Sequence, residues 1–325
     1  MSLIDIGVNF HSSQLKGRGA ELLARAAAAG VTDILATGTS WPSSRQALAF
    51  AREHARVWAT AGVHPHTAKE WDATSADEFA ALWADDRVVA VGECGLDYNR
   101  MFSPRDAQRH AFEAQIGAAV RLDKPLFLHC RDAFDDFQAM LRDAAAAGAL
   151  GVVHCFTDGA AEAEACLALG FDIGITGWVT DAARGTGLRD ALRVIPLDRL
   201  HLETDAPYLR PRNAGKTRPY NEPALLPFVA QAVAELKQVD VASLSAHATA
   251  NSRRLFKLPA RKIWFFADLR GDRHRLSGRG CASCFACGEA LRFALRACRV
   301  LRFACAEVAR APGWAGVWGA GEPYR

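Results

Sequence analysis

The chain has 325 residues, of which 50% are hydrophobic and 23% are charged, and its formal net charge is +3. These proportions exclude extensive disorder, and no apolar stretch reaches the roughly 18 uninterrupted residues of a membrane-spanning helix, so no membrane partner is expected. The start of the chain lacks the basic segment and apolar run of a secretory signal, which predicts a cytoplasmic protein.

Short apolar runs alternate eight times with Ala- and Leu-rich stretches over most of the chain. The runs predict strands at residues 4–9, 33–37, 57–63, 88–93, 125–129, 151–155, 171–177 and 200–205. The intervening stretches predict helices that include residues 20–29, 108–122, 134–147, 160–168 and 224–234. Apolar strands alternating with helices are typical of a parallel sheet, and eight such units in about 250 residues predict an α/β fold of the (β/α)8 TIM barrel type.

Polar residues follow a pattern within this alternation, because each ends a different predicted strand. They are Asn9, His64, Glu93, His129, His154 and Asp205. The carboxyl ends of barrel strands converge on one mouth, where catalytic groups belong. An open doubly wound sheet would also explain the alternation, but it would present its strand ends in a row, so six separate strand ends favour the barrel.

Three of these residues, Glu93, His129 and His154, each end an apolar run and are each followed by cysteine. Because side chains alternate along a strand, all three can face the barrel axis while the cysteines point into the helix layer as packing residues. One carboxylate and two imidazoles form a site for a divalent cation with open coordination positions. Each histidine alone could equally be a hydrogen-bonded core residue.

Other polar residues of the same mouth are candidates for catalysis and substrate binding. Asp205 could act as a general base or as a further metal ligand, and the alternative is a helix cap. His64 could hydrogen-bond a phosphate or be a structural histidine. His66 and Arg131 are further expected substrate contacts in the same mouth, with Arg100, Arg210 and Arg212 further out.

Ordered motifs from the start of the chain to about Leu258 resemble the TatD family of metal-dependent deoxyribonucleases. The motifs lie at residues 5–9, 62–66, 92–97, 128–133, 153–157, 174–179, 203–209 and 221–223. The resemblance implies a TIM-barrel hydrolase over residues 1–258. It further implies a 3'-5' exonuclease on single-stranded DNA and RNA that depends on Mg2+, with Mn2+ or Zn2+ as alternatives, and that is linked to DNA repair. We expect it to be a monomer.

The first predicted strand differs in sequence from that of the wider metal-dependent hydrolase superfamily to which the TatD family belongs. Members of that superfamily open with an Asp-x-His-x-His motif, and the two histidine positions here are Gly7 and Asn9. The half of a binuclear metal site that this motif builds is therefore in doubt, whereas Glu93, His129 and His154 are intact. The same substitution is a feature of one branch of the family, so it favours that branch.

Composition alone does not indicate a nucleic-acid substrate. Residues 1–260 contain 27 Lys and Arg against 31 Asp and Glu, so the barrel is slightly acidic. Aromatic residues that follow predicted strand ends could stack on unpaired bases or could be ordinary packing residues. They are Tyr98, Phe102, Phe156, Trp178 and Tyr208.

The remainder, residues 259–325, is predicted to be a basic extension rich in Arg and Cys. Residues 261–325 contain 12 Lys and Arg against 5 Asp and Glu, and five of the nine cysteines. Cys281, Cys284, Cys287 and Cys298 are a weak metal-ligand pattern, and arginines at 292, 296, 299 and 302 could form a basic helix. The composition also fits a disordered or out-of-frame tail.

Two other function classes remain open at this point. One is an amidohydrolase-type barrel that hydrolyses a small cyclic amide or a base, although the missing first-strand histidines disfavour it. The other is a barrel without catalytic activity that serves as a binding module.

Overall fold

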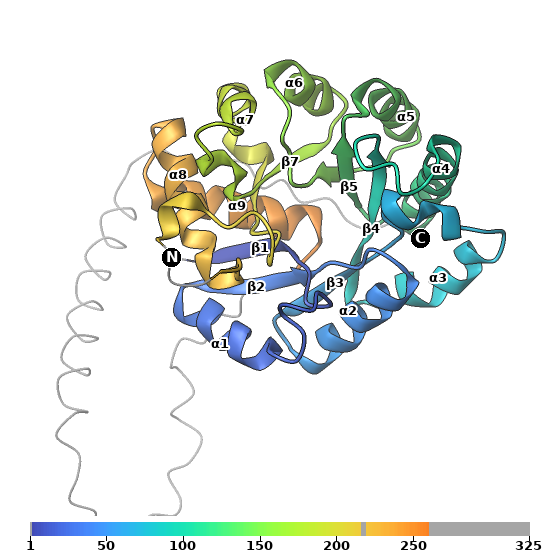
Figure 1. The fold of residues 1–325 in the computed structure, drawn as a ribbon, viewed down its shortest axis with the longest axis horizontal. Coiled ribbons are helices and arrows are strands. Elements are labelled where there is room, and N and C mark those ends of the chain that lie inside the picture. The colour runs from blue at the N-terminus through green and yellow to red at the C-terminus, as the bar shows by residue number, and fades with distance from the viewer. Residues whose placement is uncertain (1, 216–218, 260–325) are drawn as a thin grey trace, which may run out of the picture. The chain divides into compact units, whose positions relative to one another are not determined.

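A computed structural model describes residues 2–215 and 219–259, and the predicted basic extension after Pro259 lies outside the described residues. Eight strands surround one axis and the helices lie outside them (Figure 1). The strands are β1 (Leu3–Val8), β2 (Val31–Ala36), β3 (Val57–Ala61), β4 (Val88–Asp97), β5 (Leu126–Arg131), β6 (Gly151–Val153), β7 (Asp172–Ile175) and β8 (Leu200–Leu202). The helices are α1 (Gly19–Ala28), α2 (Trp41–Glu53), α3 (Ser75–Trp83), α4 (Arg105–Leu122), α5 (Phe134–Ala146), α6 (Ala160–Ala168), α7 (Thr186–Ala191), α8 (Leu226–Lys237) and α9 (Val241–Leu255).

The strand order confirms a (β/α)8 barrel. Neighbouring strands pair in parallel in the order β1 to β8, without the reversal that marks a doubly wound sheet. The segment after β8 returns to β1, where the backbone N–H of Asn9 donates to the carbonyl of Ala206 at 2.8 Å. The N–H of Asp205 donates to the carbonyl of Gly7 at 2.9 Å. These bonds bring the first and last strands together.

The core forms two clusters that follow from the apolar strand pattern. The larger one lies between the strands and the helices, and the smaller one includes Ile4, Ile6 and Phe127 from the strands. Phe256 and Leu258, at the end of the described chain, pack into the smaller cluster. Side chains cap the starts of two of these α-helices: Ser40 accepts from the backbone N–H of Ser43 at 3.4 Å at the start of α2, and Asp240 accepts from that of Ser243 at 2.7 Å at the start of α9.

All eight predicted strands and all five predicted helices are present, but two strands run further than expected. β4 extends to Asp97 and β5 to Arg131, so Glu93 and His129 lie within strands and not at their ends. β4 can continue beside β5 because its glycines let the two backbones approach closely, and a residue with a side chain would not fit at these positions. A Cβ at Gly92 would lie 2.3 Å from the carbonyl oxygen of Phe127, and one at Gly95 would lie 1.9 Å from that of His129.

No helix in the described part of the chain is both long and apolar enough to span a membrane.

Candidate active site

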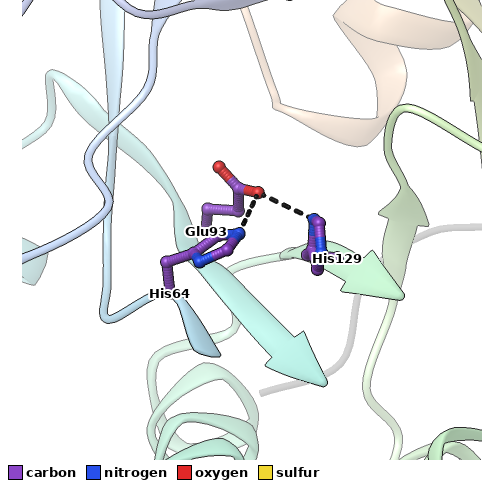
Figure 2. A group of neighbouring side chains, drawn as sticks. All are labelled: His64, Glu93 and His129. Carbon is purple, nitrogen blue, oxygen red and sulfur yellow. Dashed lines mark ion pairs between the residues drawn. The ribbon is translucent and has the colours of Figure 1, made fainter. Parts of the chain in front are cut away.

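Three imidazoles converge on a single carboxylate oxygen, Oε1 of Glu93. Nε2 of His64 and Nδ1 of His129 each lie 3.2 Å from it (Figure 2). Nε2 of His154 lies 2.8 Å from the same atom. Glu93 is held on β4 and His129 on β5, while His154 directly follows β6 and His64 follows β3. The barrel therefore brings together the predicted ligands Glu93, His129 and His154, and adds His64 to them.

The cluster is buried, yet it faces a cavity at the mouth of the barrel. Glu93 is 5% exposed and His154 is 4% exposed. The cavity has a volume of about 400 Å3, and its wall includes Asn9, His64, His66 and Asp205. Cavities of this size hold small ligands or parts of larger ones.

Behind each imidazole lies a second group that faces its other nitrogen. Nδ1 of His154 lies 3.3 Å from Oε2 of Glu203. Nε2 of His129 lies 3.4 Å from Oδ2 of Asp97, too poorly aligned for a hydrogen bond, and is buried without a hydrogen-bond partner among the described residues. Nδ1 of His64 instead accepts from the backbone N–H of His66 at 3.1 Å.

These environments shift the pKa values of the cluster in different directions. Burial lowers the pKa of His64 to about 4, so this imidazole is neutral. Burial also opposes ionisation of Glu93, but the charge of His154 and the hydrogen bonds from the surrounding imidazoles outweigh it and hold the pKa of Glu93 well below its usual range. For His154 burial favours the neutral ring, and the neighbouring carboxylates of Glu93 and Glu203 raise its pKa well above the ordinary value.

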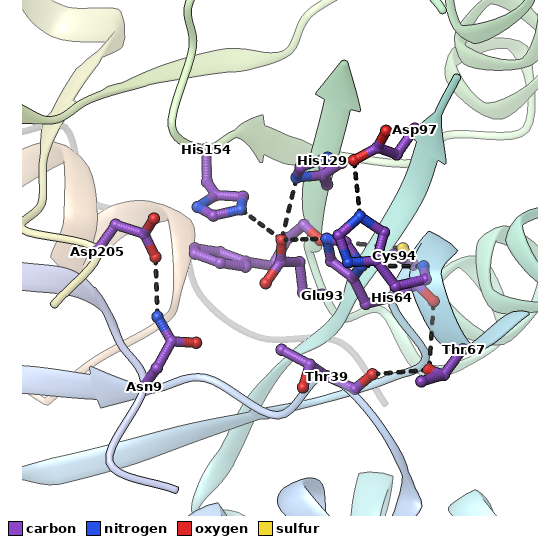
Figure 3. A network of polar contacts seen from close by, with 12 residues as sticks. Asn9, Thr39, His64, Thr67, Glu93, Cys94, Asp97, His129, His154 and Asp205 are labelled. Carbon is purple, nitrogen blue, oxygen red and sulfur yellow. Dashed lines mark hydrogen bonds and ion pairs between the residues drawn. The ribbon is translucent and has the colours of Figure 1, made fainter. Parts of the chain in front are cut away.

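Asp205 lies on the same side of Glu93 as His154, with Asp97 on the opposite side (Figure 3). Its Oδ1 accepts a hydrogen bond from Nδ2 of Asn9 at 2.9 Å. Burial raises the pKa of Asp205 to about 7, although the charge of His154 opposes the shift. The structure thus places Asp205 in the wall of the cavity, held by the residue that replaces the second histidine of the first-strand motif.

The two remaining predicted substrate contacts lie at different distances from the cluster. His66 lines the cavity, and its Nε2 lies 2.8 Å from Oδ2 of Asp97. Arg131 lies outside the cluster, with its guanidinium carbon 5.7 Å from the ring centroid of Trp178.

Sequence reasoning missed Glu203, which fills the space beside the first strand. Glu203 is fully buried, and its carboxylate receives the backbone N–H of Cys155 besides its contact with His154. A Cβ at Gly7 or at Gly174 would lie 2.6 Å from one of its oxygens. Any side chain at Gly7 would therefore displace this carboxylate. The sequence did contain a signal for Glu203. It lies two positions before Asp205 in the predicted strand 200–205, and side chains two apart in a strand point to the same side.

The expectation for the three cysteines is correct for two of them. Cys94 and Cys130 pack against the cluster between strands and helices. Cys155 instead lines the active-site cavity, because β6 ends at Val153 and strand alternation no longer applies two residues later. The backbone of Cys155 has a positive φ of 47°, which redirects its side chain.

The aromatic residues after the strand ends divide by exposure. Tyr208 is 54% exposed and Phe102 is 56% exposed, so both rings are accessible from solvent. Tyr98 and Trp178 are partly buried. Phe156 is 3% exposed in the core, so it is a packing residue.

Comparisons with known proteins agree with this geometry. The sequence profile of the TatD related DNases matches residues 4–257. The 3'-5' ssDNA/RNA exonuclease TatD of Erwinia amylovora is 47% identical over 259 residues, which cover 79% of this chain and all of the relative. The protein of that name from Klebsiella pneumoniae is 48% identical, over 78% of this chain and 97% of its own. Among solved structures, the TatD homologue YJJV of Escherichia coli superposes with a TM-score of 0.73 at 29% identity, covering 79% of this chain and 98% of its own.

Proposed function

The chain belongs to the TatD family of related DNases, and from this membership we propose that it is a metal-dependent 3'-5' exonuclease acting on single-stranded DNA and RNA. Enzymes of this family are hydrolases of phosphodiester bonds. The observation that carries the proposal is the convergence of three imidazoles on Oε1 of Glu93 within a cavity of about 400 Å3.

The donor set fits a divalent cation. His64, Glu93 and His129 each offer a ligand atom, and these atoms lie within 4.8 Å of one another. A carboxylate with neutral imidazoles is a common donor set for divalent ions.

The groups behind the imidazoles favour Glu93, His129 and His154 as the ligands. A carboxylate can only accept, so Glu203 holds an N–H at Nδ1 of His154. Nε2 faces Glu93, and a cation bound there would replace the hydrogen on Nε2 and use its lone pair. In His129, Nδ1 is the atom that faces Glu93, at 3.2 Å, and Nε2 lies on the side of Asp97.

His64 has the opposite polarity. Its Nδ1 accepts a backbone N–H, so the hydrogen of the neutral ring is at Nε2 and points toward Glu93. We assign His64 to hydrogen-bond donation, to Glu93 or to a phosphate oxygen, and not to metal binding.

The ion itself we take to be Mg2+, as the family resemblance implies, with Mn2+ or Zn2+ as alternatives. Carboxylate ligands suit Mg2+ and Mn2+, and imidazole ligands suit Zn2+. When bound, such a cation neutralises charge on the phosphodiester and makes its phosphorus more open to attack.

The chain's own residues then supply proton transfer and positioning. Asn9 holds Oδ1 of Asp205, which leaves Oδ2 to accept a proton from the attacking water. His64 and His66 border the cavity and serve as phosphate contacts. Arg131 lies outside the cavity wall, near Trp178, and would contact the bound nucleic-acid strand there. A role in DNA repair, a monomeric state and a cytoplasmic location stay predictions.

An oligonucleotide assay separates this function from its rivals. A single-stranded oligonucleotide labelled at its 5' end should shorten stepwise with Mg2+, and chelation with EDTA should stop it. The same strand labelled at its 3' end should release the label as a mononucleotide at once. Hydrolysis of dihydroorotate without strand shortening would favour an amidohydrolase-type barrel, and strand binding without cleavage under any divalent ion would favour a binding module.

A further inference from the structure

A second cavity lies next to the active-site cavity and has a different chemistry. Its volume is about 250 Å3, and its wall includes Trp178, Asp181, Arg184, Leu209, Arg210 and Arg212. We call it the arginine pocket. Tyr208 lines the active-site cavity and the next residue, Leu209, lines the arginine pocket, so the segment after β8 borders both.

A buried carboxylate holds two of the arginines in place. Oδ2 of Asp181 accepts from Nε and Nη2 of Arg184 at 3.1 and 2.8 Å and from Nη2 of Arg212 at 3.2 Å. A guanidinium has five N–H donors, so both arginines keep donors for a ligand. With Arg210 included, three positive charges face one negative charge in a domain that is otherwise slightly acidic.

The third arginine carries an unmet hydrogen-bond donor. Nη2 of Arg210 donates to the carbonyl of Ala214 at 3.2 Å. Its Nε is buried without a partner among the described residues. A buried charged donor without a partner is costly, and an anion beside Arg210 would reduce that cost by lowering the local potential.

Trp178 connects this pocket to the strand that carries His129. The guanidinium carbon of Arg184 lies 4.4 Å from the Trp178 ring centroid, and that of Arg131 lies 5.7 Å away. The indole Nε1 donates to the carbonyl of Arg184 at 3.0 Å, which fixes the ring. Arginines around a fixed indole suit a ligand with both phosphate groups and flat rings.

We propose that the arginine pocket binds the sugar-phosphate backbone of the single strand beyond the bond being cleaved, with Trp178 stacking on a base of that strand. Arg184 and Arg212 contact the phosphates, and Asp181 is a positioning residue that orients them. This assignment rests on the proposed exonuclease function, and it makes the enzyme favour strands of several nucleotides over single phosphodiesters.

Strand binding in EDTA tests the pocket separately from catalysis. A fluorescent single-stranded 10-mer is titrated by anisotropy at several NaCl concentrations with wild type and with Arg184→Ala/Arg212→Ala. Each lost phosphate contact lowers the salt slope for single strands by about 0.7, so the double variant should lose about 1.4 and bind at least about tenfold more weakly. The matched control is Arg142→Ala/Arg193→Ala, which removes the same charge from exposed positions outside both cavities.

Trp178→Ala should weaken binding of the 10-mer but leave the binding of an abasic 10-mer and the salt slope unchanged. Arg184→Lys/Arg212→Lys should restore the salt slope, because lysine keeps the charge. Equal binding by the alanine and control double variants would overturn the proposal.

Kinetics distinguish failure of this proposal from failure of the function. The alanine double variant should raise KM for the 10-mer about tenfold while its turnover of bis(p-nitrophenyl) phosphate, which has one phosphate, stays at the wild-type rate. Unchanged kinetics on the 10-mer would overturn the proposal that the arginine pocket binds the strand. An equal loss of activity on both substrates with a lower melting temperature would also overturn it, because that result indicates a structural role for the two arginines. A wild type that cleaves neither substrate with any divalent ion would overturn the exonuclease function instead.

Discussion

Nδ1 of His154 lies 3.3 Å from Oε2 of Glu203, a carboxylate that is fully buried between Gly7 and Gly174. This contact holds an N–H at Nδ1 of His154 and orients the ring so that Nε2 faces Glu93. A buried carboxylate is costly unless it is paired, and here the imidazole and a backbone N–H offset the cost. The metal-binding role proposed for His154 therefore depends on a residue outside the active-site cavity.

Glu203→Gln should weaken metal binding by roughly 10- to 100-fold, because a neutral amide orients and polarises His154 less than a carboxylate does. Isothermal titration with Mn2+ measures the affinity. Glu164→Gln, an exposed position on α6, is the matched control and should bind like the wild type. An unchanged affinity in Glu203→Gln, with an unchanged melting temperature, would contradict the role assigned to Glu203.

His154→Asn and His64→Asn should separate metal binding from turnover. The first removes a ligand and should abolish Mn2+ binding, whereas the second removes a hydrogen-bond donor and should retain Mn2+ within about threefold. Turnover should fall in both, by roughly 100-fold in His64→Asn. Equal loss of metal in the two variants would show that His64 is a ligand.

The rate of strand cleavage should rise with pH as Asp205 ionises. Only the ionised carboxylate accepts a proton, and burial raises the pKa of Asp205 to about 7. A bound cation favours the ionised form, so the midpoint should lie at or below about pH 7. Asp205→Asn should lose roughly 100- to 10,000-fold in kcat and lose this pH step. If the pH dependence of the cleavage rate keeps the same step in Asp205→Asn, a residue other than Asp205 accepts the proton.

Fold stability should depend on pH through Asp5, which is buried on β1. Burial raises the pKa of Asp5 to about 8, and hydrogen bonds from Thr204 only partly oppose this. The folded state thus binds one proton more than the unfolded state between about pH 4 and 8, so stability falls as pH rises, by at most about 1.4 kcal/mol per unit.

Asp5→Asn should flatten this dependence, since the amide stays neutral. Urea unfolding at pH 6, 7 and 8 measures the free energy of unfolding, and Asp135→Asn, exposed on α5, serves as the control. If the difference between wild type and Asp5→Asn is the same at all three pH values, Asp5 is ionised in the folded protein.

The barrel was predictable from the sequence because its strands are buried on both faces and thus read as continuous apolar runs. The positions of Glu93, His129 and His154 followed from where these runs end. The length of β4 did not, since the sequence does not show that Gly92 and Gly95 allow close packing against β5.

The groups behind the imidazoles were also missed. Glu203 and Asp97 touch the imidazoles from outside the cavity, and pattern reasoning identifies strand ends without showing which acids meet across the barrel. The orientation of Cys155 depends on a positive φ that no periodicity reveals.

The central claim is that Glu93 holds the ion on which strand cleavage depends. The most direct measurement is the shortening of a 5'-labelled single-stranded oligonucleotide by Glu93→Gln beside the wild type, at saturating Mg2+, with bound metal quantified in the same samples. The account predicts stepwise shortening by the wild type, and loss of both metal and cleavage in a variant with wild-type helix content. Cleavage at the wild-type rate by Glu93→Gln would contradict it.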